Sequence, residues 1–498
     1  MEYLKDFDVT PILIGILLSV ITLHLWYGRR RYRLPPGPIG VPLLGYLPFL
    51  ERESFLTFKK LSEKYGNIFS LYLGRSLVVV LNDYKLIKEA FSQQALLGRP
   101  PHIFDFHPDG LGFAGTNGEE WVDQRRFTMK AMRDVGFGRS QWENLLMVEV
   151  EEFRDWLKTH GGKPVNIYRF LSASVSNNMT SLVFGKRLPA GDPIRNIVDN
   201  DVEAVTRAFS QSGFITYFPK LLSLIAKISF TRLGKERKIM VRFNNYLKSE
   251  VEARKKVLTT ESSEEMFLDG YLKEIERNKQ KNIQSSFTEN RLLGNSQAIV
   301  IGGSETTRTA ISWLLLAMVT YPEVQKKVQE EIDTVLGKDG KITWMERAKL
   351  PYVCATMMEA QRWRTVVPLS VIRRANADTA INSYDIPKGT DIIPNIWAVH
   401  NDPEYWKEPE KFNPQRFLVE ENGKLTATKP EGYIPFSIGR RNCPGELVAL
   451  IEILQYFVVL MQNFTLLPEV DGKLPDLSGK LGATYQCKPQ KIRFVPRD

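Results

Sequence analysis

The segment that decides the fold reads Pro435-Phe436-Ser437-Ile438-Gly439-Arg440-Arg441-Asn442-Cys443-Pro444-Gly445-Glu446. It stands directly before an apolar run, 446–464, which is hydrophobic on nearly every face of a helix and is therefore expected to be buried. Pro444 suits the first position of that helix. Cys443 would then lie at the positive helix end, among free backbone N–H groups and close to Arg441, and these neighbours favour its thiolate.

The spacing around the cysteine indicates what the thiolate binds. Gly439 and Gly445 lack side chains, so the backbone can approach a flat partner closely. An ionised thiolate on such a loop suits an axial ligand of heme iron, whereas a lone cysteine would more simply be a buried structural residue. The full pattern F-x-x-G-x-R-x-C-x-G, which begins at Phe436, favours the ligand. Five fixed residues occur by chance in on the order of one chain in ten thousand. In this pattern the segment resembles the heme-binding signature of the cytochrome P450 family, the heme-thiolate monooxygenases.

The rest of the chain predicts a mainly helical α+β protein. Helices are expected at 54–64, 118–133, 141–158, 167–184, 196–211, 232–258, 288–320, 322–336 and 444–463. Strands are expected at 68–72, 77–81, 371–374, 384–396 and 480–496, with a hairpin at Gly74-Arg75. The resemblance implies the cytochrome P450 fold, with a large helical domain, a small β-rich domain and one N-terminal transmembrane helix. Residues 35–498 would form the catalytic domain.

The first 34 residues are expected to be a membrane anchor and a basic, proline-rich hinge. Residues 9–27 carry no formal charge and would span about 28 Å as a helix, close to the hydrocarbon thickness of a bilayer. Acidic residues precede this run and four arginines follow it, so the positive-inside rule places the remainder of the chain in the cytoplasm. A cleaved signal peptide is the alternative. The segment Leu34-Pro35-Pro36-Gly37-Pro38 is expected to be a stiff link that separates anchor and body.

A polar notch interrupts the long apolar helix expected at 288–320. Gly302-Gly303 would cost roughly 2 kcal/mol relative to alanine, and for glycines alone close helix packing is the simpler explanation. Ser304-Glu305-Thr306-Thr307 follows at once. The resemblance implies that this is the oxygen-activation groove, in which Thr306 hydrogen-bonds dioxygen and Glu305 supplies protons through water.

Several arginines are candidate ligands of the heme propionates. Trp121 and Arg125 lie at i and i+4 on one face of their helix, and the resemblance implies that they contact a propionate. Arg441 and Arg373 are expected to do the same, because a guanidinium offers a carboxylate a bidentate fork. Arg99 is a weaker candidate. For each arginine taken singly, a solvated charge is the alternative.

A second acid–base group is expected to be structural. Glu359 and Arg362 are three residues apart on a helix, where a surface ion pair is the default. Arg416 follows about fifty residues later in Pro414-Gln415-Arg416-Phe417. The resemblance implies that Glu359, Arg362 and Arg416 form a buried network that holds the core on the heme side.

Composition and charge bear on partners and compartment. Hydrophobic residues make up 43% and charged residues 25%, which excludes wholesale disorder. Three cysteines cannot form a secreted disulfide framework, so a reducing compartment is favoured. The net charge of +10 suggests an acidic partner or a membrane surface. Arg126, Lys130 and Arg133 form a stripe that is either a solvated face or, with Arg440, a docking surface for an acidic electron donor.

Apolar residues mark the expected substrate site and a possible membrane contact. By resemblance, Phe113, Ile299, Gly302 and Val367 line a pocket that selects its substrate by shape. The segment 214–230 is unusually apolar for a connection between two helices. It is expected to be either a covered part of the core or a shallow membrane contact beside a substrate entrance.

The resemblance implies a single-pass protein of the endoplasmic reticulum membrane whose catalytic domain faces the cytoplasm. It would bind heme b and insert one oxygen atom of O₂ into a lipophilic substrate by hydroxylation or epoxidation. Electrons would come from NADPH through NADPH–cytochrome P450 reductase, with cytochrome b5 as an optional second donor, because the chain has no dinucleotide-binding fingerprint. No nucleic-acid partner is expected. Two alternatives are a heme-thiolate isomerase or dehydratase that needs no reductase, and a non-catalytic membrane protein that binds heme or a lipid.

Overall fold

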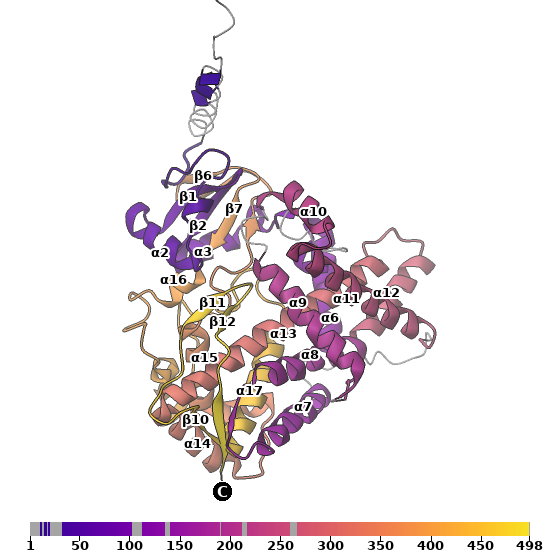
Figure 1. Ribbon diagram of the computed structural model, residues 1–498, viewed down its shortest axis with the longest axis vertical. Coiled ribbons are helices and arrows are strands. Elements are labelled where there is room, and N and C mark those ends of the chain that lie inside the picture. Colours follow the sequence, from indigo (N-terminus) through magenta and orange to yellow (C-terminus); the bar gives the residue numbers. More distant parts are fainter. Residues whose placement is uncertain are drawn as a thin grey trace, which may run out of the picture.

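Helices make up most of the body of the protein (Figure 1). The computed structural model describes residues 10–11, 14–16, 18–19, 32–101, 112–134, 140–189, 191–211, 217–258 and 266–497. Its α-helices are α2 (Ser54–Tyr65), α3 (Tyr84–Ser92), α5 (Gly112–Gly115), α6 (Gly118–Asp134), α7 (Ser140–Lys158), α8 (Tyr168–Phe184), α9 (Pro193–Gln211), α10 (Pro219–Lys227), α11 (Arg232–Lys255), α12 (Phe267–Gln280), α13 (Glu289–Thr320), α14 (Pro322–Leu336), α15 (Pro351–Trp363), α16 (Ile396–His400) and α17 (Glu446–Asn463).

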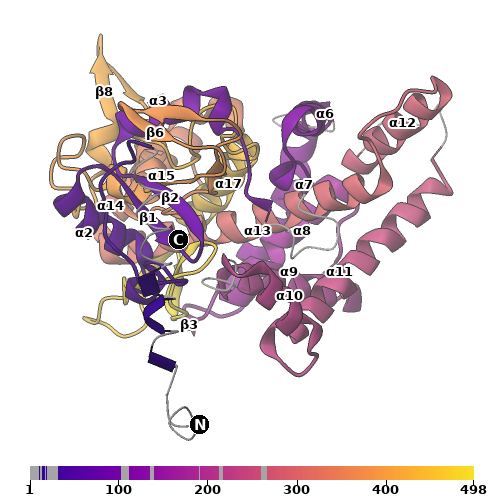
Figure 2. The same cartoon turned by 90° about the horizontal axis from the view of Figure 1, so that it is seen from above.

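The strands form small sheets. They are β1 (Ile68–Leu73), β2 (Ser76–Leu81), β3 (Pro164–Val165), β4 (Arg373–Arg374), β5 (Thr379–Ile381), β6 (Tyr384–Ile386), β7 (Asp391–Pro394), β8 (Leu418–Glu421), β9 (Lys424–Ala427), β10 (Phe464–Pro468), β11 (Gly479–Leu481), β12 (Tyr485–Cys487) and β13 (Ile492–Pro496). The largest sheet has the order β1-β2-β7-β4, in which β2 and β7 are parallel and the other neighbours antiparallel. It lies on the other side of the molecule from α11 and α12 (Figure 2).

Two long helices build the centre of the core. α13 packs against α8, α5 and α17, and α17 packs against α7 and α14. Most apolar side chains of both helices are buried, as the continuous apolar pattern of 446–464 predicted. Among the described residues, α17 is the one helix long and apolar enough to cross a membrane, and 67% of this stretch is buried in the protein. It is therefore a core helix.

The hairpin and most of the predicted helices are confirmed within a few residues. Gly74, in the turn between β1 and β2, has a φ of 59°, a conformation that glycine adopts without strain. Three details were wrong. The strands expected at 384–396 and 480–496 are each broken by turns. α17 begins at Glu446, so Pro444 lies before the helix and not at its first position. Helices α3, α5, α10, α12, α15 and α16 were not among the expected helix ranges.

The proline-rich hinge packs on the body and does not hold it at a distance. The hydroxyl of Ser70 donates to the carbonyl of Pro35 (2.6 Å), and its N–H donates to that of Pro36 (2.8 Å). A Cβ atom on Gly37 would lie 1.7 Å from the Ser70 carbonyl oxygen, so only glycine fits there. The predicted anchor, 9–27, lies largely outside the described residues. Its described parts, 10–11, 14–16 and 18–19, are helical and project from the body (Figure 1).

Candidate heme-thiolate site

The loop that carries Cys443 is held in shape by its own backbone. The N–H of Cys443 donates to the carbonyl of Phe436 (2.9 Å), and the N–H of Asn442 donates to that of Gly439 (3.0 Å). Gly439 has a φ of 76°, and a Cβ atom there would lie 2.4 Å from the carbonyl oxygen of Phe91 in α3. This glycine therefore lets the loop pack on α3. The cysteine is placed three residues before the start of α17.

The thiol of Cys443 faces a space that solvent can reach. Burial raises its pKa to about 11, although the Gly445 N–H and Arg125 act in the opposite direction. The residue is nevertheless exposed, so a ligand can reach it. The N–H groups at the helix end act toward ionisation, as expected, but desolvation of the free thiol outweighs them. A bound metal cation reverses this balance, since a coordinating thiol is deprotonated outright.

Four arginines from four parts of the chain converge near this loop. Arg99, Arg373 and Arg441 are buried and Arg125 is half-buried. Burial lowers the pKa of Arg99 to about 9, and Arg125 adds to this effect. Burial together with the other arginines lowers the pKa of Arg373 and of Arg441 to about 8. Guanidinium groups stay protonated in proteins, so these shifts express the free-energy cost of holding like charges together.

These arginines bond to backbone carbonyls and to one amide side chain. Arg441 donates to the carbonyls of Leu97, Phe113 and Thr116, and Arg373 donates to that of Ile438. Arg99 donates to the carbonyls of residues 371 and 372. Arg125 donates to the backbone and side-chain oxygens of Asn442, at 2.9 and 2.8 Å. Within the described part of the chain, no carboxylate lies within 4.0 Å of any of the four.

The arrangement fits a heme. Several buried nitrogen atoms in it have no hydrogen-bond partner among the described residues, namely Arg99 Nε, Arg373 Nη1 and Trp121 Nε1. The Trp121 ring stacks on the Arg441 guanidinium at 3.8 Å. Unpaired cations and donors fit a ligand with two carboxylates, as heme propionates provide. The described residues contain no group of three or more His, Cys, Asp or Glu side chains that could hold a bare metal ion, whereas heme iron needs a single thiolate.

The two glycines of α13 have different roles. A Cβ atom on Gly303 would lie 2.2 Å from Sδ of Met179 in α8, so this glycine permits close helix packing. A Cβ atom on Gly302 would meet nothing within 4 Å, and this residue is exposed. The hydroxyl of Thr306 donates to the Gly302 carbonyl at 2.7 Å. Close helix packing therefore accounts for Gly303, whereas Gly302 leaves open space beside α13.

Glu305 is buried and turned toward other partners than Thr306. Its Oε1 atom accepts hydrogen bonds from Arg308 (2.6 Å), Thr484 (3.1 Å) and Gln486. Arg308, Thr484 and Gln486 were not singled out in the sequence. Arg308 could have been found from its i+3 spacing to Glu305, but Thr484 and Gln486 come from a distant hairpin.

The predicted substrate-lining residues fall in two groups. Phe113 on α5 and Ile299 on α13 are buried, each with 6% of its surface exposed, and their helices pack together. Gly302 lies one turn further along α13. Val367 is half-buried in the loop before β4.

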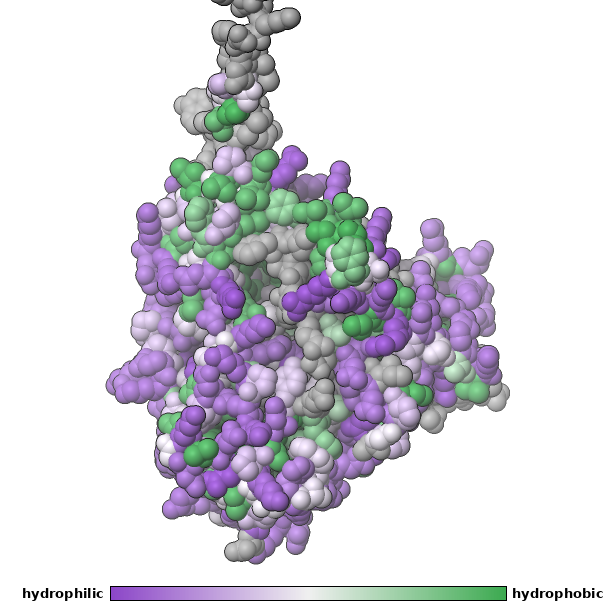
Figure 3. All heavy atoms as spheres, viewed as in Figure 1, coloured by the Kyte–Doolittle hydropathy of each residue, from purple (hydrophilic) through white to green (hydrophobic). Residues whose placement is uncertain are grey.

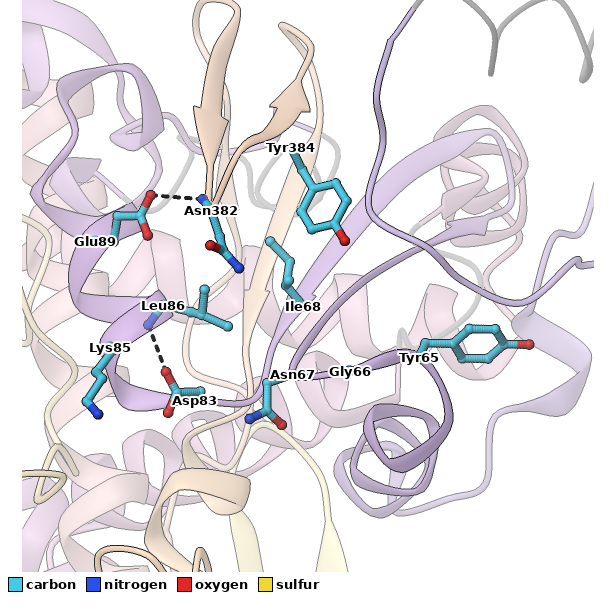
Figure 4. A pocket seen from close by; sticks show the side chains of 10 residues that line it. All are labelled: Tyr65, Gly66, Asn67, Ile68, Asp83, Lys85, Leu86, Glu89, Asn382 and Tyr384. Atoms are coloured by element: carbon cyan, nitrogen blue, oxygen red, sulfur yellow. Dashed lines mark hydrogen bonds between the residues drawn. The ribbon is translucent and has the colours of Figure 1, made fainter.

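A separate pocket of about 500 Å³ lies at the surface between α2, α3 and the β5–β6 hairpin (Figure 4). Asp83 and Glu89 in it accept backbone N–H groups of Leu86 and Asn382, so they serve the local fold. The pocket shares none of its lining residues with the Cys443 site.

The second acid–base group is buried, as the resemblance implied, and is not a surface ion pair. Glu359 and Arg362 are fully buried and pair at 2.7 Å, and Arg416 reaches Glu359 at 3.2 Å. Arg362 also donates to the carbonyls of His400, Pro409 and Lys411.

Comparison with known proteins agrees with this geometry. The family model described as "Cytochrome P450" matches residues 35–494. Cytochrome P450 18a1 of Drosophila melanogaster is 33% identical over 94% of this chain and 89% of its own length. Human cytochromes P450 2J2 and 2A6 are each 33% identical, over 92% and 91% of this chain and 90% and 92% of their own lengths. The chain belongs to the cytochrome P450 family. It has the family's fold, binds heme b and is a monooxygenase.

Proposed function

We propose that Cys443 is the axial ligand of the heme iron and that Arg99, Arg125, Arg373 and Arg441 bind the propionates. This assignment rests on the convergence of four arginines beside an exposed cysteine. Among the described residues, no carboxylate forms an ion pair with any of these arginines. Phe436 and Gly439 shape the loop, and Trp121 supports the Arg441 guanidinium.

The reaction we propose is RH + O₂ + NADPH + H⁺ → ROH + H₂O + NADP⁺, or the corresponding epoxidation. The bound heme supplies the oxygen chemistry, and a thiolate ligand favours O–O cleavage. Gly302 leaves room beside α13, the Thr306 hydroxyl can donate a hydrogen bond at that opening, and Glu305 is the source of protons. The apolar side chains of Phe113, Ile299 and Val367 line the substrate site, which suits a lipophilic molecule selected by shape.

Electrons reach the site from a separate NADPH–cytochrome P450 reductase, with cytochrome b5 as an optional second donor. Arg126, Lys130, Arg133 and Arg440 are exposed cations that can attract an acidic protein surface. Arg126 pairs with Asp123 at 2.7 Å but remains 75% exposed. Docking through these residues would weaken as the salt concentration rises.

The body also contacts the membrane, and the protein resides in the endoplasmic reticulum with this body in the cytoplasm. Apolar side chains gather over α10 and at the end of the body from which the described residues 10–11, 14–16 and 18–19 project (Figure 3). Leu221 (48%), Leu224 (61%) and Phe230 (81%) are exposed in or just after α10. Ile39 (80%) and Leu43 (70%) are exposed in the segment after the hinge. This exposure favours the membrane-contact interpretation of 214–230 over a covered core segment, although 214–216 lie outside the described residues.

The test uses the full-length holoenzyme in lipid vesicles with the reductase, NADPH and a panel of steroids, sesquiterpenoids and foreign apolar compounds. We expect a product that carries one oxygen atom from ¹⁸O₂ and forms only with NADPH and the reductase. A product that forms without the reductase would instead support the isomerase or dehydratase. Heme binding with no turnover on any compound would support a non-catalytic heme protein.

A further inference from the structure

The Glu305 carboxylate is held on the side of α13 that faces the β11–β12 hairpin. Three donors meet at its Oε1 atom: the Arg308 guanidinium at 2.6 Å, the Thr484 hydroxyl at 3.1 Å and the Gln486 amide. Glu305 is 6% exposed. The neighbouring Thr306 hydroxyl donates to the Gly302 carbonyl instead. The proton source and the hydroxyl that it should serve are therefore not hydrogen-bonded to each other in this structure.

The hairpin is built to hold this contact. Thr484 ends the turn of the hairpin and Gln486 lies in β12, and both side chains reach the same carboxylate oxygen of Glu305. The Thr484 and Thr309 hydroxyls lie 3.4 Å apart. Because the single hydroxyl proton of Thr484 goes to Glu305, Thr309 must donate to Thr484. The indole N–H of Trp313 also donates to the carbonyl of Tyr485 at 2.7 Å. The hairpin is thus fixed to α13 at Thr484 and at Tyr485, next to the Glu305 contact.

The same hairpin is tied to the predicted substrate site. The N–H of Tyr485 donates to the carbonyl of Val366 at 2.7 Å. Val366 precedes Val367, one of the residues proposed to contact substrate. A displacement of this loop would therefore pull on the residue that lies between Thr484 and Gln486.

A buried ion pair holds the Glu305 side chain in this position. The carboxylate forms a buried ion pair with Arg308, and the Tyr168 ring covers that guanidinium at 4.0 Å. Burial acts to lower the pKa of Arg308, but Glu305 and the neighbouring Tyr168 and Cys487 outweigh it and raise that pKa. To pass a proton toward Thr306, the carboxylate has to leave these partners.

We propose that Gln486 and Thr484 are positioning residues that hold Glu305 away from Thr306 until substrate, pressing on the loop at 366–367, moves the β11–β12 hairpin. The proposal rests on the proposed role of Glu305 as proton source. Its consequence is that the enzyme without substrate wastes little reductant, because protons are withheld from the reaction NADPH + H⁺ + O₂ → NADP⁺ + H₂O₂.

The first test measures the contact itself by hydrogen–deuterium exchange of the heme-loaded protein. Glu305→Gln keeps the size of the side chain but removes its charge. We expect the amide groups of residues 484–487 to exchange at least about threefold faster, the effect of weakening one hydrogen bond. Glu289→Gln, at the exposed start of the same helix, is the matched control and should leave the hairpin unchanged. Equal exchange in Glu305→Gln and wild type would overturn the proposal, whatever the role of Glu305 in turnover.

The second test measures hydrogen peroxide formed from NADPH in the presence of reductase and the absence of substrate. Gln486→Leu should raise this rate roughly threefold or more. Lys480→Ala, which changes the residue paired with Gln486 across the hairpin, should leave the rate of peroxide formation unchanged.

In a Glu305→Gln background, Gln486→Leu should not change the rate of peroxide formation any further. If Gln486 had only a structural role, its substitution would still change this rate in that background. If Glu305→Gln alone leaves the peroxide-to-product ratio at its wild-type value with substrate, the proposed role of Glu305 fails. An unchanged rate in Gln486→Leu contradicts the hairpin device.

Discussion

Two buried clusters of arginine in this protein differ in what satisfies their charge. Around Glu359 the guanidinium groups of Arg362 and Arg416 meet a buried carboxylate and a set of backbone carbonyls. Beside Cys443, burial and then the neighbouring arginines lower the pKa of Arg99, Arg373 and Arg441. Nitrogen atoms of Arg99 and Arg373 have no partner among the described residues. The first cluster is complete within the protein, whereas the second is complete only with an anionic ligand. Burial alone therefore does not distinguish a structural arginine from a ligand-binding one. The hydrogen-bond and ion-pair partners of the arginine do.

The largest loss of stability is expected when the ion-paired cluster around Glu359 is broken. Arg362→Ala leaves Glu359 buried without its main partner, which costs about 3–5 kcal/mol. We expect urea unfolding at a much lower concentration, or no soluble protein, with and without heme. Arg416→Ala is the milder variant, because Arg416 reaches Glu359 from the edge at 3.2 Å. A stable Arg362→Ala protein would show that this cluster is not structural.

Adjacent residues in β4 allow the comparison to be made within one dipeptide. Arg373 has no carboxylate partner among the described residues, whereas Arg374 pairs with the buried Asp391 at 2.7 Å. Arg373→Met should weaken heme binding about 10- to 100-fold, the value of a charge-assisted hydrogen bond, without lowering the stability of the heme-free protein.

The matched variant Arg374→Met should do the reverse. It leaves Asp391 unpaired and lowers stability, while the folded fraction keeps its affinity for heme. Hemin titration and urea unfolding of both variants measure the two effects. Equal losses of stability from the two substitutions would remove the distinction between the clusters.

Acid should destabilise the protein through His400, whose carbonyl accepts a hydrogen bond from Arg362 in the cluster around Glu359. Burial, with a contribution from Arg362, lowers the pKa of His400 to about 3. The unfolded chain therefore binds one more proton than the native protein between pH 6.5 and about 3. The contribution of His400 to stability is present above pH 6.5 and is lost as the pH falls through this window, by up to about 1.4 kcal/mol per pH unit. In urea titrations, His400→Gln should flatten this slope; an unchanged slope would mean that His400 is not the group responsible.

The smallest effect is expected at the glycine pair of α13. Gly303→Ala should destabilise the protein by about 1 kcal/mol, because its Cβ atom meets Met179 and the flexible sulfur has to move. Gly302→Ala should stabilise α13 by up to about 1 kcal/mol but narrow the open side of the helix and change the distribution of products. Thermal unfolding and product analysis separate the two. Identical behaviour of both variants would place the two glycines in one environment.

The sequence predicted those parts of the site that depend on local spacing. The motif around Cys443, the Trp121–Arg125 face and the notch at Gly302 follow from residues a few positions apart. The convergence of Arg99 with Arg373 was only weakly indicated, because the two lie in distant segments and meet through tertiary packing. The different roles of Gly302 and Gly303 depend on Met179 in another helix. The pKa of the free thiol was mispredicted since helix-end effects were visible in the sequence, whereas burial was not.

The fold shows the same division. Long periodic helices such as α13 and α17 were predicted almost to the residue, because their apolar patterns continue for many turns. The strand expected at 384–396 was wrong, because the turn at 387–390 lies within an otherwise strand-like composition. Gly389, with a φ of 90°, was the signal that could have revealed the break.

The proposed function depends above all on Cys443 binding the heme iron as a thiolate. The most direct measurement is the absorption spectrum of the reduced, carbon-monoxide-bound protein in wild type, Cys443→Ala, Cys354→Ala and Cys487→Ala. We expect the thiolate-type band in wild type and in both control variants, and its complete loss in Cys443→Ala. A thiolate-type band that persists in Cys443→Ala, or disappears in one of the folded controls, would contradict it.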